Sequence, residues 1–481
     1  MRFSTVRGRV SGRHRPAHSS HPCGTCGPVG ALAVLLLFAA LSGCASHNQE
    51  LVDVRTSLAA GDVPAAVAAF EKRKEKESDL LYWLDRGYMM HLAGRWNESN
   101  EAFEKAEKRA EDLYTKSLSR AAASLVTSDL SLPYRGAAHE LQFIQYYRAL
   151  NYLALGTPDD ALVEARKANE YLSRYAEETQ GQEHFRQDAF LQYFTGILYE
   201  SRGEANDAAI SLRDAWARYG EYEAAFGEGA PPWLMSDYYA AAEHVGRQTD
   251  LEELRALDST VAARAGEGNT HNTVVYFECG FVPYRESVRI TLPIFDGNTL
   301  DQMATAEKYV NAYGDDIYAY EKSNVKLDHV LSFAFPRLVE IPAQVVTCEL
   351  ALPSGEVFQA EPAIHLAAVA AADFRRRMPE ILLKTVARAL AKEALRKAAK
   401  KEDETFGWIV NTINVATEQA DTRSWILLPG RIYMLKTELP PGAHELTARF
   451  YGGEGELLGE ARKTVQVTTG STSVTTFRCF K

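Results

Sequence analysis

Apolar and alanine positions recur at helical spacing through residues 48–255, with almost none of the two-residue alternation that marks a half-buried strand. A glycine in this half is followed, at fixed offsets, by two mostly small or apolar residues, as in Gly94, Ser99 and Phe103. Glycine ends a helix in the left-handed conformation, and small side chains let helices approach closely. The pattern predicts an all-α array of stacked helix pairs over residues 44–255, with a simple helical bundle as the alternative. The same register recurs after Gly61, Gly156 and Gly203.

This register resembles the tetratricopeptide repeat, whose helix pairs stack into an array with a concave binding side. The resemblance implies that the first helix of each pair presents apolar and tyrosine side chains to that side. Tyrosine suits a protein-binding surface because its rigid ring gives apolar area and its hydroxyl can bond to a peptide. The alternative is that these side chains fill the core between the helices. The candidate partner-binding residues are Leu84, Tyr88, Phe143, Tyr146, Phe190 and Tyr193.

The pattern changes beyond residue 255. The polar, glycine-containing stretch 256–272 predicts a linker, and residues 273–277 begin a series of short runs rich in β-branched and aromatic residues. Near the C-terminus, four such runs are separated by turn sequences such as Pro440-Pro441-Gly442. We therefore expect a C-terminal α+β domain over residues 273–481, with an antiparallel β-sandwich-like part.

One helical pattern interrupts this β region, at about residues 379–416. Leu382, Val386, Leu390 and Ala394 form an apolar stripe, and basic residues make up much of the remaining surface. A basic amphipathic helix can lie on anionic lipid or bind an acidic partner. The alternative is a helix that packs on the sheet and leaves its basic face in solvent. The basic residues are Lys384, Arg388, Lys392, Arg396, Lys397 and Lys400.

The chain begins with a basic segment and an apolar run at residues 29–41, which is shorter than a membrane-spanning helix. The run ends in Leu-Ser-Gly-Cys at residues 41–44, which resembles the lipobox of bacterial lipoproteins. The resemblance implies a signal peptide at residues 1–43 and lipidation of Cys44, with an ordinary cleavage site as the alternative. Because Ala45 is not aspartate, the resemblance to enteric-type sorting favours the outer membrane, with the body facing the periplasm.

Composition narrows the class of partner. The chain of 481 residues carries 53 Lys and Arg against 64 Asp and Glu, which gives a net charge of −11. Nucleic acid is therefore a poor partner, since phosphate binding requires Lys and Arg to displace counterions. We expect a protein or peptide partner, and contact with the membrane through the N-terminal lipid.

Two tracts resemble a family of uncharacterised bacterial lipoproteins that have N-terminal tetratricopeptide-like repeats and a C-terminal β-rich domain. The first is Leu-Pro-Tyr-Arg-Gly at residues 132–136, continued by residues 146–153, and the second is Gln-Ala-Asp-Thr-Arg-Ser-Trp at residues 419–425. The resemblance covers most of the mature chain and implies a two-part fold on a lipid tether, but no activity. Within the second tract, Asp421 and Arg423 are spaced to pair with each other or to cap neighbouring chain ends.

The sequence contains few signals of chemistry. It has no His-Glu-x-x-His zinc motif, phosphate-binding Gly-x-x-x-x-Gly-Lys loop or Gly-x-Ser-x-Gly nucleophile turn, so no metal or cofactor is expected. Cys279, Cys348 and Cys479 lie on or beside predicted strands. They are compatible with one disulfide and one remaining thiol, or with three buried thiols.

These observations together predict a non-catalytic, lipid-anchored scaffold or adaptor of the cell envelope, which binds a protein or peptide through its helical array. The tether raises the local concentration, so that even a weak partner is held at the membrane. Two alternatives stay open: an envelope enzyme that acts on peptidoglycan, and an accessory subunit of a secretion or assembly apparatus.

Overall fold

The computed structural model describes residues 47–74, 79–117, 130, 132–178, 188–268, 271–295, 327–402 and 419–481. Residues Ala45–Lys481 form one compact unit. The expected signal peptide and Cys44 lie outside the described residues, as do residues 403–416 of the expected helical insertion. Within the described ranges, none of the helices has both the length and the apolar character needed to span a bilayer.

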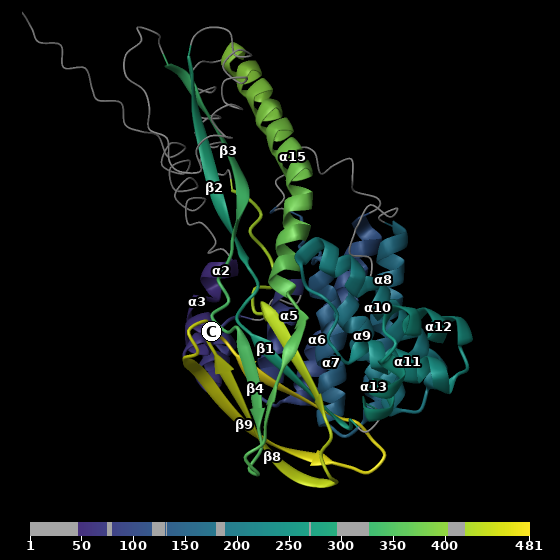
Figure 1. Cartoon of the computed structure of the whole chain (residues 1–481). Helices are drawn as coiled ribbons and strands as arrows, with labels where there is room; N and C mark the ends of the chain where they lie inside the picture. Colours follow the sequence, from purple (N-terminus) through teal and green to yellow (C-terminus); the bar gives the residue numbers. More distant parts are fainter. Residues whose placement is uncertain are drawn as a thin grey trace, which may run out of the picture. The chain divides into compact units, whose positions relative to one another are not determined.

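The N-terminal half consists of helix pairs that follow one another along the chain (Figure 1). The two helices of a pair are joined by a turn with a glycine in the left-handed conformation, where φ is 79° at Gly61 and 71° at Gly94. Turn glycines with positive φ recur at Gly156, Gly203 and Gly246, which confirms the predicted register. The helices are α2 (His47–Glu50), α3 (Val52–Ala59) with α4 (Val63–Glu71), α5 (Leu80–Leu92) with α6 (Trp96–Ser117), α7 (Ala138–Ala154) with α8 (Pro158–Glu178), α9 (Ala189–Ser201) with α10 (Ala205–Phe226), α11 (Leu234–His244) with α12 (Gln248–Leu257), and α13 (Val261–Gly268).

In two of the pairs, the helices come close where the first helix has a glycine. A Cβ atom on Gly87 of α5 would lie 2.5 Å from the ring of Phe103 on α6, and one on Gly196 of α9 would lie 2.7 Å from the side chain of Leu212 on α10. No larger residue fits at either position without moving its neighbour. The small residues that the sequence places at fixed offsets therefore set the distance between paired helices.

Helix α13 lies within the stretch 256–272 that we expected to be a linker. Val261 is fully buried and Ala265 is nearly so, and α13 packs against α11. One hydrophobic core extends from Leu51 in the first helix pair to Phe480 beyond the last strand, so the helices and the strands share it. The division of the chain into two domains stays a prediction.

The strands form three sheets. A central sheet has the order β10-β1-β7-β6, an outer sheet has the order β5-β4-β8-β9, and β2 and β3 form a two-stranded hairpin. Strands β1 and β10 are parallel, with Thr273 opposite Ser473, a pairing that the sequence did not predict. The strands are β1 (Thr273–Cys279), β2 (Tyr284–Phe295), β3 (Leu327–Val339), β4 (Thr347–Ala351), β5 (Val357–Gln359), β6 (Glu361–Ile364), β7 (Arg431–Thr437), β8 (Gly442–Tyr451), β9 (Leu457–Val467) and β10 (Ser473–Cys479).

The central sheet lies between the helices and the outer sheet. Alternate side chains of β1 point to opposite faces, and every residue of this strand is buried. Val274 and Tyr276 join the core shared with the helices, whereas Val275 and Phe277 join a second core shared with the outer sheet. The order of layers is therefore helices, central sheet, outer sheet. A C-terminal sheet region is confirmed, and its description as a sandwich stays a prediction.

Three thiols lie in the second core. Cys279, Cys348 and Cys479 are buried and unpaired, and the Sγ atoms of Cys279 and Cys348 are 3.7 Å apart. Burial raises the pKa of the Cys348 thiol. Of the two arrangements that the sequence left open, the structure contains the three buried thiols.

Helix α15 (Leu366–Glu402) begins earlier than the expected start near residue 379, and Pro379 lies inside it. The alanine-rich first turns pack into the core, where Leu366 is fully buried and Val369 nearly so. The Ala367 amide donates to the Gly430 carbonyl at 2.8 Å, which satisfies one of the free donors at the start of the helix. From this base α15 runs beside the β2–β3 hairpin and packs against β3 (Figure 1).

Candidate functional site

The six candidate partner-binding residues lie in the interior. Leu84, Tyr88, Phe143, Tyr146, Phe190 and Tyr193 are each at most 1% exposed. The ring of Tyr276 on β1 lies 5.5 Å from that of Phe190 and 6.3 Å from that of Tyr146, so the central sheet of the same chain covers this side of the array. The expected open groove is therefore absent at these described residues. A partner-binding role for them stays a prediction, and it would require the strands to move away.

Polar atoms of these tyrosines join the helices to the strands. The Tyr88 hydroxyl accepts from Nε of Arg478 on β10 at 2.9 Å, and burial raises the pKa of Tyr88 to about 12. The Tyr193 hydroxyl donates to Asp237 at 2.5 Å, and Lys436 on β7 donates to the same carboxylate oxygen at 2.6 Å. Buried polar groups need such partners, so these contacts fix the position of the central sheet against the helices.

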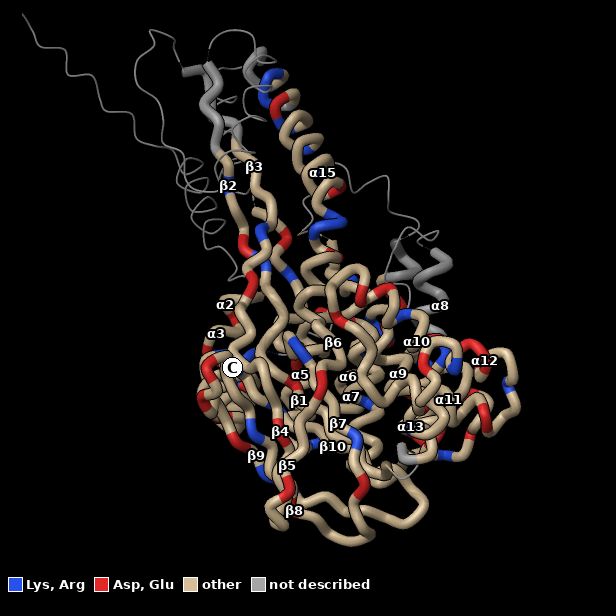
Figure 2. Tube along the Cα trace, viewed as in Figure 1, with Lys and Arg blue, Asp and Glu red and all other residues tan. Residues whose placement is uncertain are grey.

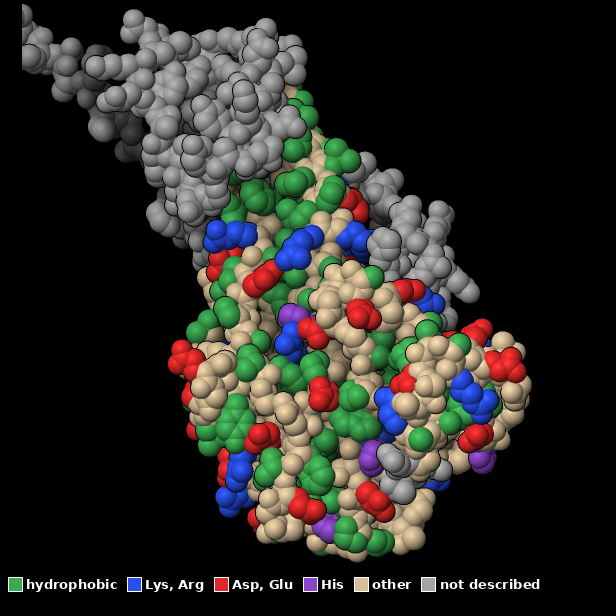
Figure 3. Space-filling view, viewed as in Figure 1, with side chains coloured by type: hydrophobic (Ala, Val, Ile, Leu, Met, Phe, Trp, Pro, Cys, Tyr) green, Lys and Arg blue, Asp and Glu red, His purple; other side chains and the backbone are tan. Residues whose placement is uncertain are grey.

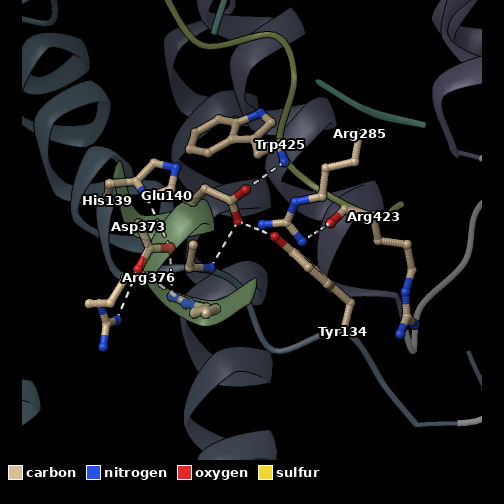
Figure 4. A network of polar contacts seen from close by, with 10 residues as sticks. Tyr134, His139, Glu140, Arg285, Asp373, Arg376, Arg423 and Trp425 are labelled. Atoms are coloured by element: carbon tan, nitrogen blue, oxygen red, sulfur yellow. Dashed lines mark hydrogen bonds and ion pairs between the residues drawn. The ribbon is translucent and has the colours of Figure 1, made fainter. Parts of the chain in front are cut away.

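The two tracts that carry the family resemblance meet in a network of polar contacts, which we call the junction (Figure 4). Glu140, at the start of α7, accepts from the Trp425 amide at 2.8 Å and from the Ala137 amide at 3.0 Å. The Tyr134 hydroxyl donates to the same carboxylate. Trp425 is fully buried. A single carboxylate thus connects the loop before α7 to a segment far away in the sequence.

Arg423 makes the second connection in the junction. It pairs with Asp421 at 2.8 Å, as the spacing predicted, and it also donates to the Leu132 carbonyl at 2.9 Å. Its guanidinium lies 5.7 Å from the centre of the Tyr134 ring, and its own carbonyl accepts from Arg285 at 3.2 Å. A charge-assisted pair that also binds a carbonyl and an aromatic ring holds its chain segment firmly. We interpret the junction as a structural lock.

The base of α15 is attached beside the junction. Asp373 lies 4.0 Å from Nδ1 of His139 and within 3.1 Å of both Arg376 and Arg377. The arginines and His139 lower the pKa of Asp373 despite its burial, whereas burial lowers the pKa of His139. Figure 4 shows these side chains on the side of Glu140 away from Arg423.

The basic face predicted for α15 is only partly present. Arg388 and Arg396 are buried, at 8% and 4% exposed, and Arg396 bonds to Glu393 at 2.9 Å. Lys384 pairs with Glu380 at 2.6 Å, and Lys397 lies 3.6 Å from Glu393. Figure 2 shows residues of both signs along this helix. Binding of lipid or of an acidic partner by its basic residues stays a prediction. Lys392 is half-buried, and the side chain of Lys400 lies outside the described residues.

The apolar stripe predicted for α15 is largely exposed instead of packed. Val386 and Leu390 are 40% and 46% exposed, and Leu383 is 71% exposed, whereas Thr385 and Ala389 are buried. The buried face is thus rotated from the one that the hydrophobic pattern indicates. Figure 3 shows hydrophobic side chains along the part of α15 that the grey atoms leave visible.

A large cavity opens at the edge of the central sheet, and we call it the edge groove. Its volume is about 1240 Å³. The helix-pair turns at Gly61, Gly94 and Gly156 line one side, residues 458–466 of β9 line the other, and residues 473–481 of β10 and the following segment lie between them. The sequence predicted the turns and the strands separately, but it held no signal that they would enclose a groove.

The edge groove is more basic than the rest of this acidic chain. Its charged lining residues are Arg202, Lys463, Arg478 and Lys481 against Glu278 and Glu460. Glu278 is buried beside Arg478, and burial raises its pKa. Glu460 bonds to Arg449 and Arg462. Lys463 is exposed; it donates to the Thr476 carbonyl and lies over the Phe477 ring at 5.4 Å. Arg202 is paired with Asp159, and Arg478 is buried beside Glu278, so the positive charges that remain for a ligand are those of Lys463 and Lys481.

The described residues contain no group of three or more His, Cys, Asp or Glu side chains arranged to hold a metal ion. Carboxylates that converge, such as those around Arg73 and Arg148, are bound to these arginines.

No protein-family model matches the chain, and no curated protein matches it. Among solved structures, it is similar to the apo form of RapI, with 12% identity and a TM-score of 0.30 over 46% of this chain and 71% of that one. It is also similar to BtubC from P. vanneervenii, with 16% identity and a TM-score of 0.31 over 49% and 86%. A third is aspartyl phosphate phosphatase F from Bacillus subtilis, with 14% identity and a TM-score of 0.28 over 49% and 55%. No partner or activity follows from a likeness this distant.

Proposed function

We propose that this protein is a non-catalytic adaptor of the cell envelope that binds a peptide or an extended protein segment in the edge groove. The observation that carries the proposal is the groove itself: at about 1240 Å³ it exceeds the usual 300–1,000 Å³ of small-molecule pockets. It is built from helix-pair turns on one side and strands on the other. The binding surface is thus the edge of the helical array, while the array's covered side holds the chain's own strands.

We also propose that the adaptor is lipidated at Cys44 and faces the periplasm, most simply from the outer membrane. The first described helix is held against the body: His47 Nε2 lies 3.3 Å from Asp85, and Asn48 donates to the Arg285 carbonyl at 2.7 Å. Three residues of chain span at most about 10 Å. A lipid on Cys44 would therefore keep this corner of the protein next to the membrane.

Photo-crosslinking in intact cells tests the binding role. A photoreactive amino acid replaces Ala461, which is half-buried on β9, lines the edge groove and lies on the same face of the strand as Lys463. The matched control replaces Glu253, which is exposed on α12. We expect a discrete crosslinked protein from position 461 only, and its yield should fall at least fivefold with Lys463→Glu. Equal products from both positions would contradict the proposal.

The mass of the mature chain tests the anchor separately. We expect an N-terminal residue at position 44 that carries lipid, and release of the protein from membranes in the Cys44→Ala variant. An unmodified Cys44 in membrane-bound protein would remove the lipid tether from the proposal and leave the groove unaffected.

A further inference from the structure

We propose that the bound segment adds to the central sheet as a strand along the free edge of β10. The inference rests on the proposed function and specifies how the groove recognises its ligand. In the order β10-β1-β7-β6, β10 is the edge strand of the central sheet. Edge strands present unpaired backbone groups that template the pairing of another chain.

The register identifies which backbone groups are free. The Ser473 amide donates to the Asn272 carbonyl at 2.8 Å, and the Gly280 amide donates to the Cys479 carbonyl at 2.9 Å. Residues 473, 475, 477 and 479 therefore direct their amides and carbonyls toward β1, because backbone polar groups alternate sides along a strand. Val474, Thr476 and Arg478 direct theirs to the opposite side, where no strand of the described chain pairs with them.

The surroundings of this edge have the shape of a slot. The helix-pair turns extend past β10 on one side of the central sheet, and β9 extends past it on the other, since both line the cavity together with β10. β9 connects to β10 through side chains: Ser473 donates to the Gln466 carbonyl at 3.1 Å, and Lys463 donates to the Thr476 carbonyl. The outer layers thus continue where the middle layer stops, and the empty position is that of a fifth strand.

The walls of the slot specify the chemistry of the ligand. Alternate side chains of an added strand would point to opposite walls. The helix-side wall contains apolar residues such as Leu92 and Leu153, whereas the β9 wall contains Lys463 between the small or apolar Ala461 and Val465. The Lys463 ammonium, which now caps the Thr476 carbonyl, would be released to a ligand carboxylate as the incoming amide replaces it. The expected ligand is an extended segment in which apolar and acidic residues alternate.

The test begins with selection of displayed random octapeptides on the full chain. We expect the selected peptides to alternate apolar and acidic residues. Thr476→Pro removes the outward amide without touching the bonds to β1, and it should weaken binding of a selected peptide at least tenfold. Thr476→Ala keeps that amide and should bind within twofold of the unmodified chain. Circular dichroism checks that both variants are folded.

Two further measurements keep the result decisive if Thr476→Pro does not fold. Bound peptide should slow hydrogen exchange of the Val474 and Thr476 amides at least tenfold. In an added strand, only every second peptide amide faces β10. Methylation of the amides that face β10 should therefore abolish binding, and methylation of the amides between them should leave binding unchanged. Strand addition would be overturned by peptides that bind after methylation of either set of amides and do not slow exchange of the Val474 and Thr476 amides. Such peptides would still support the groove as a binding site. Failure to select any peptide, together with no crosslink from position 461, would overturn both the strand addition and the binding role of the groove.

Discussion

Glu140 is the residue on which the junction depends. It accepts hydrogen bonds from two backbone amides and one tyrosine hydroxyl, and it is 2% exposed. Removing a buried acceptor leaves its donors without partners, which costs about 1–3 kcal/mol for each such group. The two tracts that resemble the lipoprotein family thus bind each other through these contacts.

We predict that Glu140→Ala lowers the free energy of unfolding by about 3 kcal/mol or more, since several donors lose their partner together. Denaturant titration measures the change. The control is Glu101→Ala, at an exposed position of α6, which should change stability by less than about 0.5 kcal/mol. Equal effects of the two substitutions would contradict the role assigned to Glu140.

Asp188 gives the stability a defined pH dependence. This carboxylate caps α9 by accepting from the Leu191 amide at 2.9 Å, and burial raises its pKa to about 6. A carboxyl group whose pKa is raised in the folded state stabilises below its unfolded pKa and loses that contribution as the pH rises through the folded value.

The stability advantage of the protein over its Asp188→Asn variant should therefore decline between about pH 4 and pH 6, by up to about 3 kcal/mol at 1.36 kcal/mol for each unit of pKa. Asparagine imitates the protonated acid at every pH. Urea unfolding of both proteins at intervals of one pH unit measures the difference. A constant difference across this range would show that the Asp188 pKa is not raised.

At the scale of elements, the helix crossings follow from the sequence, whereas the face of α15 does not. Gly87 and Gly196 each lie seven residues before the turn glycine of their helix pair, and a close helix crossing needs a small residue at such a position. The buried face of α15 depends on which elements pack against the helix. A pattern of apolar residues cannot show that Val386 and Leu390 face outward while Arg388 and Arg396 are buried among partners.

Alanine substitutions at two glycines in one helix pair test the crossing. Gly196→Ala should cost about 1–3 kcal/mol, because its Cβ would lie 2.7 Å from the Leu212 side chain. Gly220→Ala in α10 meets no atom within 4 Å and should stabilise by up to about 1 kcal/mol, from helix propensity alone. Thermal unfolding distinguishes the two. Destabilisation by Gly220→Ala, or none by Gly196→Ala, would be inconsistent with the packing.

At the scale of the whole molecule, helices and strands should unfold together. Tyr276 on β1 contacts Phe190 and Tyr146 from the array, and its neighbours Val275 and Phe277 pack against the outer sheet. The sequence predicted both halves but not their contact, because an apolar residue does not indicate which surface will cover it. For this reason, the sequence predicted a binding face at the six candidate residues, whereas in the structure the strands beyond residue 272 cover them.

We predict that Tyr276→Ala lowers stability by about 3–5 kcal/mol and speeds hydrogen exchange in α7, α9 and β8 by the same factor. The control is Val357→Ala on β5, where the side chain is 52% exposed and the change should be below about 0.5 kcal/mol. Faster exchange in the helices with unchanged exchange in β8 would mean that the layers unfold independently.

The parallel pairing of β1 with β10 also constrains how the protein is made. β1 is the first strand to be synthesised, yet residues 473–479 supply its neighbour, and the junction needs residues 421–425. An emerging chain has its helix pairs available long before it can close the middle layer over them. Export across a membrane would therefore deliver a partly assembled array whose tyrosine-rich side stays exposed to chaperones and proteases until the final strands arrive.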